Sequence, residues 1–130
     1  MKIAEKCENF SSARPQTPDF SRSVCLFDSG IGGLNVLFAC RRILPDEKFV
    51  YYGDNERAPY GNLPEEAVKA YVYEAAETLT EYRPKALVLA CNTATAHCAR
   101  ALHNMYPFPI IGSYPPLLSA GKHGGEGLVL

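Results

Sequence analysis

The chain has 130 residues, of which 47% are hydrophobic and 21% are charged. Its 13 basic and 14 acidic residues give a formal net charge of −1 and are spread along the chain, which argues against nucleic acid or a membrane as a partner. No apolar run is long enough to span a bilayer. These values are typical of one soluble globular domain.

The cysteines indicate a reducing compartment. They form neither a disulfide framework nor a C-x-x-C pair, so free thiols in the cytoplasm are expected. No apolar segment follows Lys2 and Lys6, as a secretory signal would require. The five cysteines are Cys7, Cys25, Cys40, Cys91 and Cys98.

The first 22 residues are rich in Ser, Pro and charge, which predicts a flexible amino-terminal tail or a short docking extension. Residues 23–130 are expected to form one domain. Strands are predicted over 24–27, 49–52, 86–90 and 109–112, and residues 127–130 look like the opening of a fifth strand. The chain therefore looks truncated within a larger fold.

Helical patterns separate these strands. One begins near Leu34 and ends before Pro45, and a second begins at Pro64 and carries an apolar stripe from Val68 to Tyr82. A third, rich in alanine, follows Cys91. Strands that alternate with helices predict an α/β fold, with a parallel sheet flanked by helices on both faces.

Polar loops follow three of the predicted strands, at residues 28–33, 53–61 and 91–93. In a parallel sheet the carboxyl ends of the strands share one edge, and ligands bind there. The sequence therefore places these three loops around one site.

Cys91 lies between a buried strand and a helix whose first turn carries Asn92 and Thr93, residues suited to capping. The helix dipole and free amides favour a thiolate in that position. The alternative is an inert buried thiol. Packing roles are expected for Cys98, two turns further along the same helix, and for Cys25 and Cys40.

The other two loops each have a second interpretation. The glycines of loop 28–33 partly match a dinucleotide site, but Asn35 replaces the third glycine, and the negative charge of Asp28 would repel a pyrophosphate. Alternatively, Asp28 could cap the helix. In loop 53–61, Arg57 could hold a carboxylate, or the loop could be a solvated turn with an internal Asp54–Arg57 pair. The three histidines lack metal-ligand spacing, so no metal is predicted.

Three segments together resemble the glutamate racemases of the aspartate/glutamate racemase superfamily. They occur in the family's order at family-like separations, and the resemblance runs from about residue 24 to residue 112. The segments are FDSGIGGL at 27–34, YGDNERAPYG at 52–61 and ACNTATA at 90–96.

The resemblance implies one half of a two-domain racemase fold and a cofactor-independent interconversion of L- and D-glutamate, which supplies D-glutamate for peptidoglycan and so for the cell wall and cell shape. Two cysteines on opposite faces of the substrate act as acid and base in this family. By resemblance, the catalytic residues are Cys91 and Asp28, and the substrate-binding residues are Asp28, Ser29, Tyr60, Gly61, Asn92 and Thr93.

The family's second cysteine lies in a Gly-Cys-Thr-His motif of a carboxyl-terminal domain, which does not occur in these 130 residues. Residues 23–130 are therefore expected to be the amino-terminal catalytic domain, truncated before the second domain and inactive alone. Asn55-Glu56 and Tyr114-Pro115-Pro116 also depart from the common Thr-Ala and Glu-Pro-Gly.

Two alternatives remain open. One is a related racemase that acts on aspartate or a hydantoin, although the loop of Pro59, Tyr60 and Gly61 favours glutamate. The other is a non-catalytic fragment that binds an acidic amino acid or a protein partner. A homodimer is allowed, because no residue pattern sets the oligomeric state.

Overall fold

The computed structural model of the chain describes residues 2–4 and 19–114. The predictions for Cys7, His123 and residues 127–130 lie outside this part. The elements in chain order are β1 (Lys2–Ala4), β2 (Val24–Asp28), α1 (Leu34–Ile43), β3 (Phe49–Gly53), the 3-10 helix η1 (Tyr60–Asn62), α2 (Glu65–Thr80), β4 (Ala86–Leu89), α3 (Asn92–Met105) and β5 (Ile110–Gly112).

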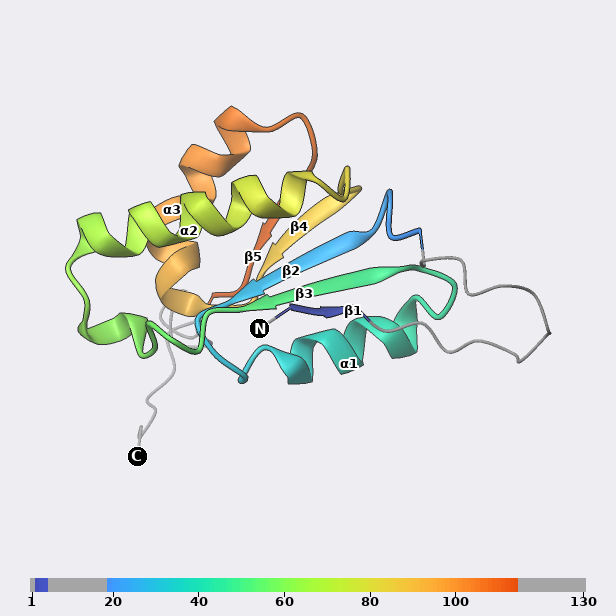
Figure 1. The fold of residues 1–130 in the computed structure, drawn as a ribbon, viewed down its shortest axis with the longest axis horizontal. Coiled ribbons are helices and arrows are strands. Elements are labelled where there is room, and N and C mark those ends of the chain that lie inside the picture. The colour runs from blue at the N-terminus through green and yellow to red at the C-terminus, as the bar shows by residue number, and fades with distance from the viewer. Residues whose placement is uncertain (1, 5–18, 115–130) are drawn as a thin grey trace, which may run out of the picture.

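The strands form one sheet in the order β1-β3-β2-β4-β5. The pairs β3–β2, β2–β4 and β4–β5 are parallel, and helices α2 and α3 cover one face while α1 covers the other (Figure 1). The predicted α/β fold with a parallel sheet flanked by helices is therefore confirmed. The four strands and three helices predicted within residues 24–112 are all present, with ends shifted by one or two residues.

The amino-terminal segment needs one correction. Lys2–Ala4, predicted to be part of a flexible tail, forms β1 and pairs antiparallel with β3. This pairing satisfies backbone groups on the edge of β3 that would otherwise stay exposed. Phe20, also in the predicted tail, packs against the larger of two core clusters.

Alternating side chains of the parallel strands build these two clusters on opposite faces of the sheet. Phe27 of β2 and Leu89 of β4 point toward α2 and α3, whereas Leu26 of β2 and Val88 of β4 belong to the cluster that contains Leu37 of α1. The sheet is thus covered on both faces, as the continuous apolar runs of its strands require.

The cysteines predicted to pack do so to different degrees. Cys25 and Cys98 are fully buried in the larger cluster, which confirms their predicted role. Cys40 is only half-buried and lies at the margin of the smaller cluster.

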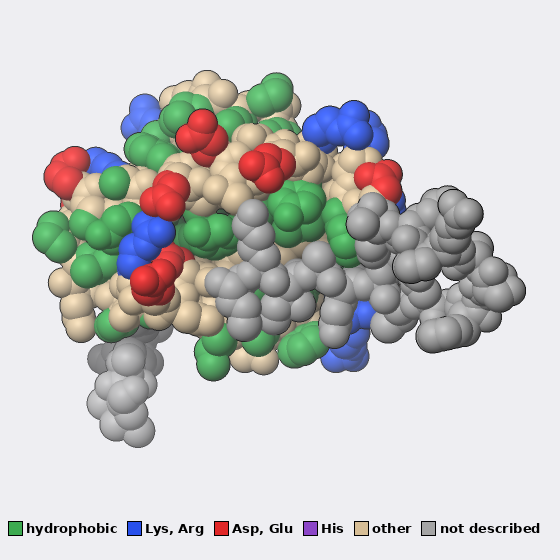
Figure 2. All heavy atoms as spheres, in the orientation of Figure 1, with side chains coloured by type: hydrophobic (Ala, Val, Ile, Leu, Met, Phe, Trp, Pro, Cys, Tyr) green, Lys and Arg blue, Asp and Glu red, His purple; other side chains and the backbone are tan. Residues whose placement is uncertain are grey.

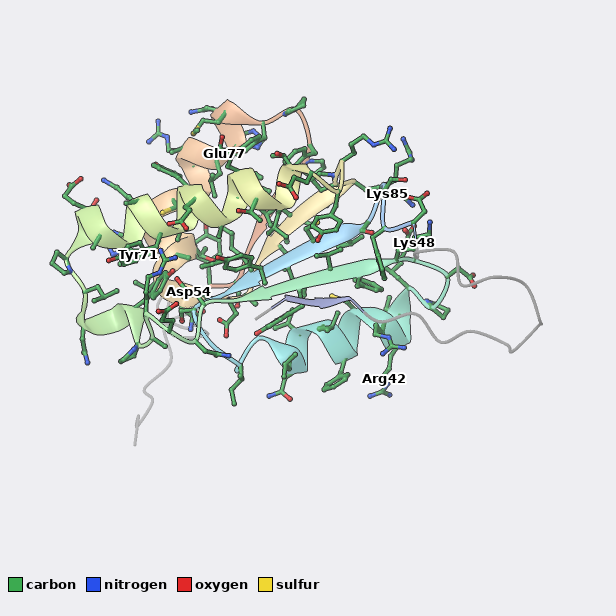
Figure 3. All side chains as sticks on the ribbon, in the orientation of Figure 1. Arg42, Lys48, Asp54, Tyr71, Glu77 and Lys85 are labelled. Atoms are coloured by element: carbon green, nitrogen blue, oxygen red, sulfur yellow. The ribbon has the colours of Figure 1, made fainter. Side chains whose placement is uncertain are left out.

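The two ends of the parallel strands carry different residues. Lys48 and Lys85 lie at the end of the sheet where the parallel strands begin, and Asp54 and Tyr71 lie at the end where they finish (Figure 3). Acidic and basic side chains are interspersed over the face shown in Figure 2. No helix in the described ranges is long and apolar enough to cross a membrane.

Candidate active site

Cys91 is the N-cap residue of α3. Its backbone is extended, at φ −84° and ψ 121°, and its sulfur accepts a hydrogen bond from the amide of Ala94 at 3.4 Å. Asn92 and Thr93 lie in the first turn of the helix, as predicted, but the N-cap residue is Cys91 and neither of them. An amide donor and the positive end of the helix dipole both stabilise negative charge on a sulfur placed there. Only 6% of Cys91 is exposed, so the sulfur is also largely shielded from water.

Asp28 organises the loop between β2 and α1. Its buried carboxylate accepts hydrogen bonds through Oδ2 from the amides of Gly30, at 3.1 Å, and Gly33, at 3.0 Å. Gly33 is itself the N-cap residue of α1, so Asp28 binds the loop rather than the first helical turn that a capping role would predict. Both amides are then used within the loop and are not free to bind the phosphate of a dinucleotide.

Ser29 joins this loop to Cys91. Its Oγ lies 3.5 Å from the Cys91 sulfur, and the backbones behind them are linked by a 2.8 Å hydrogen bond from the Ala90 amide to the Phe27 carbonyl. The thiol can donate to the hydroxyl, and after ionisation the hydroxyl can donate to the sulfur. The ends of β2 and β4 thus bring a thiol, a hydroxyl and a carboxylate together, as expected from the parallel topology.

Tyr60 does not offer its hydroxyl to a ligand. The side chain is buried, and the hydroxyl donates to Asp54 Oδ2 at 2.6 Å. Burial, followed by this hydrogen bond and the charge of Asp54, raises the pKa of Tyr60 above its ordinary range. What remains available is the backbone of η1, since the first amides of a helix have no acceptor within it. Gly61 is exposed there, and a Cβ at this position would meet no atom of the described structure within 4 Å.

Arg57 holds carboxylates of the protein itself. Its Nε lies 3.3 Å from Asp54 Oδ2, and its two terminal nitrogens donate to Glu74 of α2 at 3.0 and 3.2 Å. The guanidinium carbon also lies 4.3 Å from the ring centre of Tyr71. The predicted Asp54–Arg57 pair is therefore present, but Asp54 is buried rather than solvated. No sequence pattern pointed to Glu74, which is 17 residues from Arg57 along the chain.

Asn92 and Thr93 complete this edge of the sheet. Asn92 is exposed, with its Oδ1 3.5 Å from Ser113 Oγ, and Thr93 is half-buried. Both lie in the first turn of α3, where backbone amides lack helical acceptors. The site residues therefore supply one thiol on one side and several potential donors for an anionic ligand.

Replacing Tyr60 with phenylalanine is expected to lower the free energy of unfolding by about 1–3 kcal/mol, because Asp54 loses a buried hydrogen-bond donor. Urea denaturation of the chain measures this change. The matched control is Tyr73→Phe, which alters a half-buried tyrosine of α2 and should leave stability within about 0.5 kcal/mol of the original. Equal effects of the two substitutions would contradict the role given to the Tyr60 hydroxyl.

Cys98 is expected to make stability depend on alkaline pH. Burial raises the pKa of its thiol from 9.0 to about 11, so the folded state holds the proton more tightly than the unfolded state does. The resulting stabilisation is complete below pH 9 and is lost as the pH rises from 9 to about 11. Melting temperatures across this range should fall less for Cys98→Ala than for the original chain, and parallel curves would contradict this account.

Comparison with known proteins identifies relatives of the chain, although no protein-family model matches it. The glutamate racemase of Clostridium botulinum strain Hall is 43% identical over 111 residues, which cover 84% of this chain and 43% of the relative. The chain thus spans about two-fifths of the length of these curated relatives.

Solved structures give the same result. Glutamate racemase from Aquifex pyrophilus superposes with a TM-score of 0.72 at 33% identity, covering 80% of this chain and 41% of that one. Escherichia coli glutamate racemase, solved with L-glutamate and the activator UDP-MurNAc-Ala, superposes with a TM-score of 0.71 at 36% identity, covering 78% and 39%. The sequence and the α/β fold agree: the chain is a homologue of the glutamate racemases over less than half of their length.

Proposed function

We propose that this chain provides one half of a glutamate racemase active site, as the amino-terminal domain of that enzyme. The observation that carries the proposal is the position of Cys91. Its sulfur accepts a hydrogen bond from the Ala94 amide at the start of α3 and lies 3.5 Å from Ser29 Oγ. The relative from E. coli was solved with L-glutamate, which supports glutamate as the substrate.

Cys91 acts as the acid or base on one face of the substrate. Its thiolate removes the α proton, which moves from carbon to sulfur while the electron pair stays on the substrate as a carbanion. No cofactor takes up that charge, so hydrogen bonds to the substrate carboxylate must spread it. Asp28 assists Cys91 or contacts the substrate amine, and Ser29 helps to bind the substrate. The carboxylate groups are bound by Tyr60, Gly61, Asn92 and Thr93.

Two observations refine these binding roles. The Tyr60 hydroxyl is committed to Asp54, so Tyr60 binds through its backbone rather than its side chain. Gly61 is exposed beside open space, where a carboxylate could approach its amide. Backbone amides of η1 and of the first turn of α3 then bind the anionic ends of one glutamate molecule.

Inversion requires a second acid on the opposite face, and the proposal places it in a second cysteine outside these 130 residues. Cys98 is unsuited to that role, because it is fully buried on α3 and burial raises the pKa of its thiol to about 11. The isolated chain, expected to be inactive as a racemase, should therefore at most exchange the α proton through its half-site, without racemising its substrate. In the complete enzyme the product D-glutamate serves peptidoglycan synthesis.

The test follows two signals when the chain is incubated with L-glutamate or, separately, with D-glutamate in deuterated water. Deuterium uptake at the α carbon reports proton removal, and optical rotation reports inversion. Uptake without a change in rotation supports a working half-site. Sustained racemisation would contradict the division of labour between two domains, and absence of deuterium uptake from both L- and D-glutamate would contradict catalysis by Cys91 in the isolated chain.

A further inference from the structure

Tyr51 is a buried polar residue that the proposed function leaves without a role. It lies in the middle of β3, paired with Leu26 of β2, and its side chain is 0% exposed within the cluster under α1. A tyrosine hydroxyl in such a place needs a hydrogen-bond partner. Its partners belong to the catalytic loop after β2: Oη lies 2.8 Å from the Gly30 carbonyl oxygen and 3.4 Å from Asp28 Oδ2.

The hydroxyl has one hydrogen to donate. Because Oη lies closer to the Gly30 carbonyl oxygen than to Asp28 Oδ2, we assign the donated hydrogen bond to the Gly30 carbonyl. Asp28 Oδ2 is already an acceptor for the amides of Gly30 and Gly33. Burial, and then the charge of Asp28, raise the pKa of Tyr51 above its ordinary range, so the hydroxyl remains a donor at neutral pH. The Gly30 carbonyl therefore accepts a hydrogen bond from the Tyr51 hydroxyl, on the side of the sheet that α1 covers.

The backbone of β3 confines the same carbonyl. A Cβ placed on Gly53 would lie 2.5 Å from the Gly30 oxygen, so the backbone segments at Gly53 and Gly30 are in close contact. The Gly30 carbonyl is positioned by the Tyr51 hydroxyl and by the backbone at Gly53. The Asp28 carboxylate is positioned by the amides of Gly30 and Gly33, and Ser29 lies between Asp28 and Gly30 in the chain. The direction of the Ser29 side chain, whose Oγ is 3.5 Å from the Cys91 sulfur, follows from these two anchors.

We propose that Tyr51 is a positioning residue: its hydroxyl holds the Gly30 carbonyl beside Asp28 and thereby keeps the Ser29 hydroxyl against the Cys91 sulfur. Its importance for catalysis rests on the proposed function of Cys91, whereas its effect on the thiol does not. A hydroxyl held beside the sulfur stabilises the thiolate by donating to it. Losing that anchor should make Cys91 a weaker nucleophile near neutral pH.

The test compares alkylation of Cys91 by iodoacetamide in the original chain and in Tyr51→Phe, which removes only the hydroxyl. Peptide mass spectrometry separates Cys91 from the other cysteines. We expect alkylation at pH 7 to slow by about threefold or more, because a hydrogen bond to a charged group is lost or loosened. Tyr106→Phe, at the far end of α3, is the matched control and should keep the original rate.

A double-mutant cycle with Ser29→Ala tests the route of the effect. If Tyr51 acts through Ser29, the double variant should be no slower than Ser29→Ala alone, whereas independent effects would multiply. Multiplied effects, or an unchanged alkylation rate in Tyr51→Phe, would overturn the proposal. So would a Tyr51→Phe chain that fails to fold, because the hydroxyl would then serve stability instead of positioning.

The two proposals fail in different ways. If the original chain takes up no deuterium from glutamate but Tyr51→Phe still slows alkylation, the proposed function is wrong and the positioning role stands. If deuterium uptake occurs and Tyr51→Phe alkylates normally, the reverse holds.

Discussion

Replacing Cys91 with serine is expected to reduce deuterium uptake at the α carbon of glutamate by about 100- to 10,000-fold, the usual contribution of a positioned acid or base. A serine hydroxyl is a far weaker acid than a thiol and supplies no comparable base at neutral pH. Serine is also a favourable N-cap residue, so α3 should keep its first turn. Proton NMR of glutamate in deuterated water measures the rate, and circular dichroism checks the fold.

Cys98→Ala is the matched control for this substitution. Cys98 is on the same helix and is fully buried in the core, so its removal should leave deuterium uptake unchanged within about a factor of two. A Cys91→Ser chain that exchanges as fast as the original would show that another group removes the proton. Equal losses in both variants would point to a general effect on α3.

The second large effect is expected for Gly33→Ala, which tests how tightly the loop between β2 and α1 is packed. A Cβ on Gly33 would lie 2.8 Å from the Asp28 Cβ and 2.9 Å from the Ala90 Cβ. Gly33 has φ −67° and ψ −9°, which alanine adopts without strain, so the effect is steric. Overpacking should lower the free energy of unfolding by about 1–3 kcal/mol and, by displacing Asp28, should also slow deuterium uptake.

Gly32→Ala provides the comparison for Gly33→Ala. The added Cβ would have Asp28 Oδ2 as its nearest atom, at an ordinary 3.9 Å, so stability should change by no more than about 0.5 kcal/mol. Urea denaturation of both variants gives the difference directly. Equal destabilisation would mean that the loop tolerates no side chain at either position, contrary to the contacts seen at Gly33 alone.

The sequence was sufficient to predict the framework of the site. Apolar runs before Asp28, Gly53 and Cys91 predicted strands, and helical spacing after each predicted a parallel sheet whose carboxyl ends meet. The contact between Cys91 and Ser29, 62 residues apart, follows from that topology. Local pattern succeeded here because hydrophobic periodicity determines both the elements and the side of the sheet on which they pack.

The contacts that shape the loops could not be predicted in this way. The Tyr51 hydroxyl and the Glu74 carboxylate act on residues 21 and 17 positions away, across a sheet and between a loop and a helix. From hydrophobic periodicity alone, Tyr51 is predicted to be an ordinary strand residue and Glu74 to be part of a solvated helix face. Their roles depend on which atoms meet after packing, which periodicity does not contain.

Lys2–Ala4 shows a different limit. Three residues among polar neighbours carry too little β propensity to predict a strand, and the composition of residues 1–22 indicates a tail. The segment nevertheless pairs with β3, because an exposed strand edge supplies backbone partners whatever the side chains are. Tertiary context decides such short edge strands.

The central claim, that Cys91 serves one face of glutamate, is tested most directly by the choice of enantiomer. The chain is incubated separately with L-glutamate and D-glutamate in deuterated water, and the initial rates of α-deuterium uptake are compared. A single base on one side of the α carbon should act on one enantiomer at least about 100 times faster than on the other, given the contribution expected of a positioned base. Equal initial rates for both enantiomers would contradict a one-sided site at Cys91.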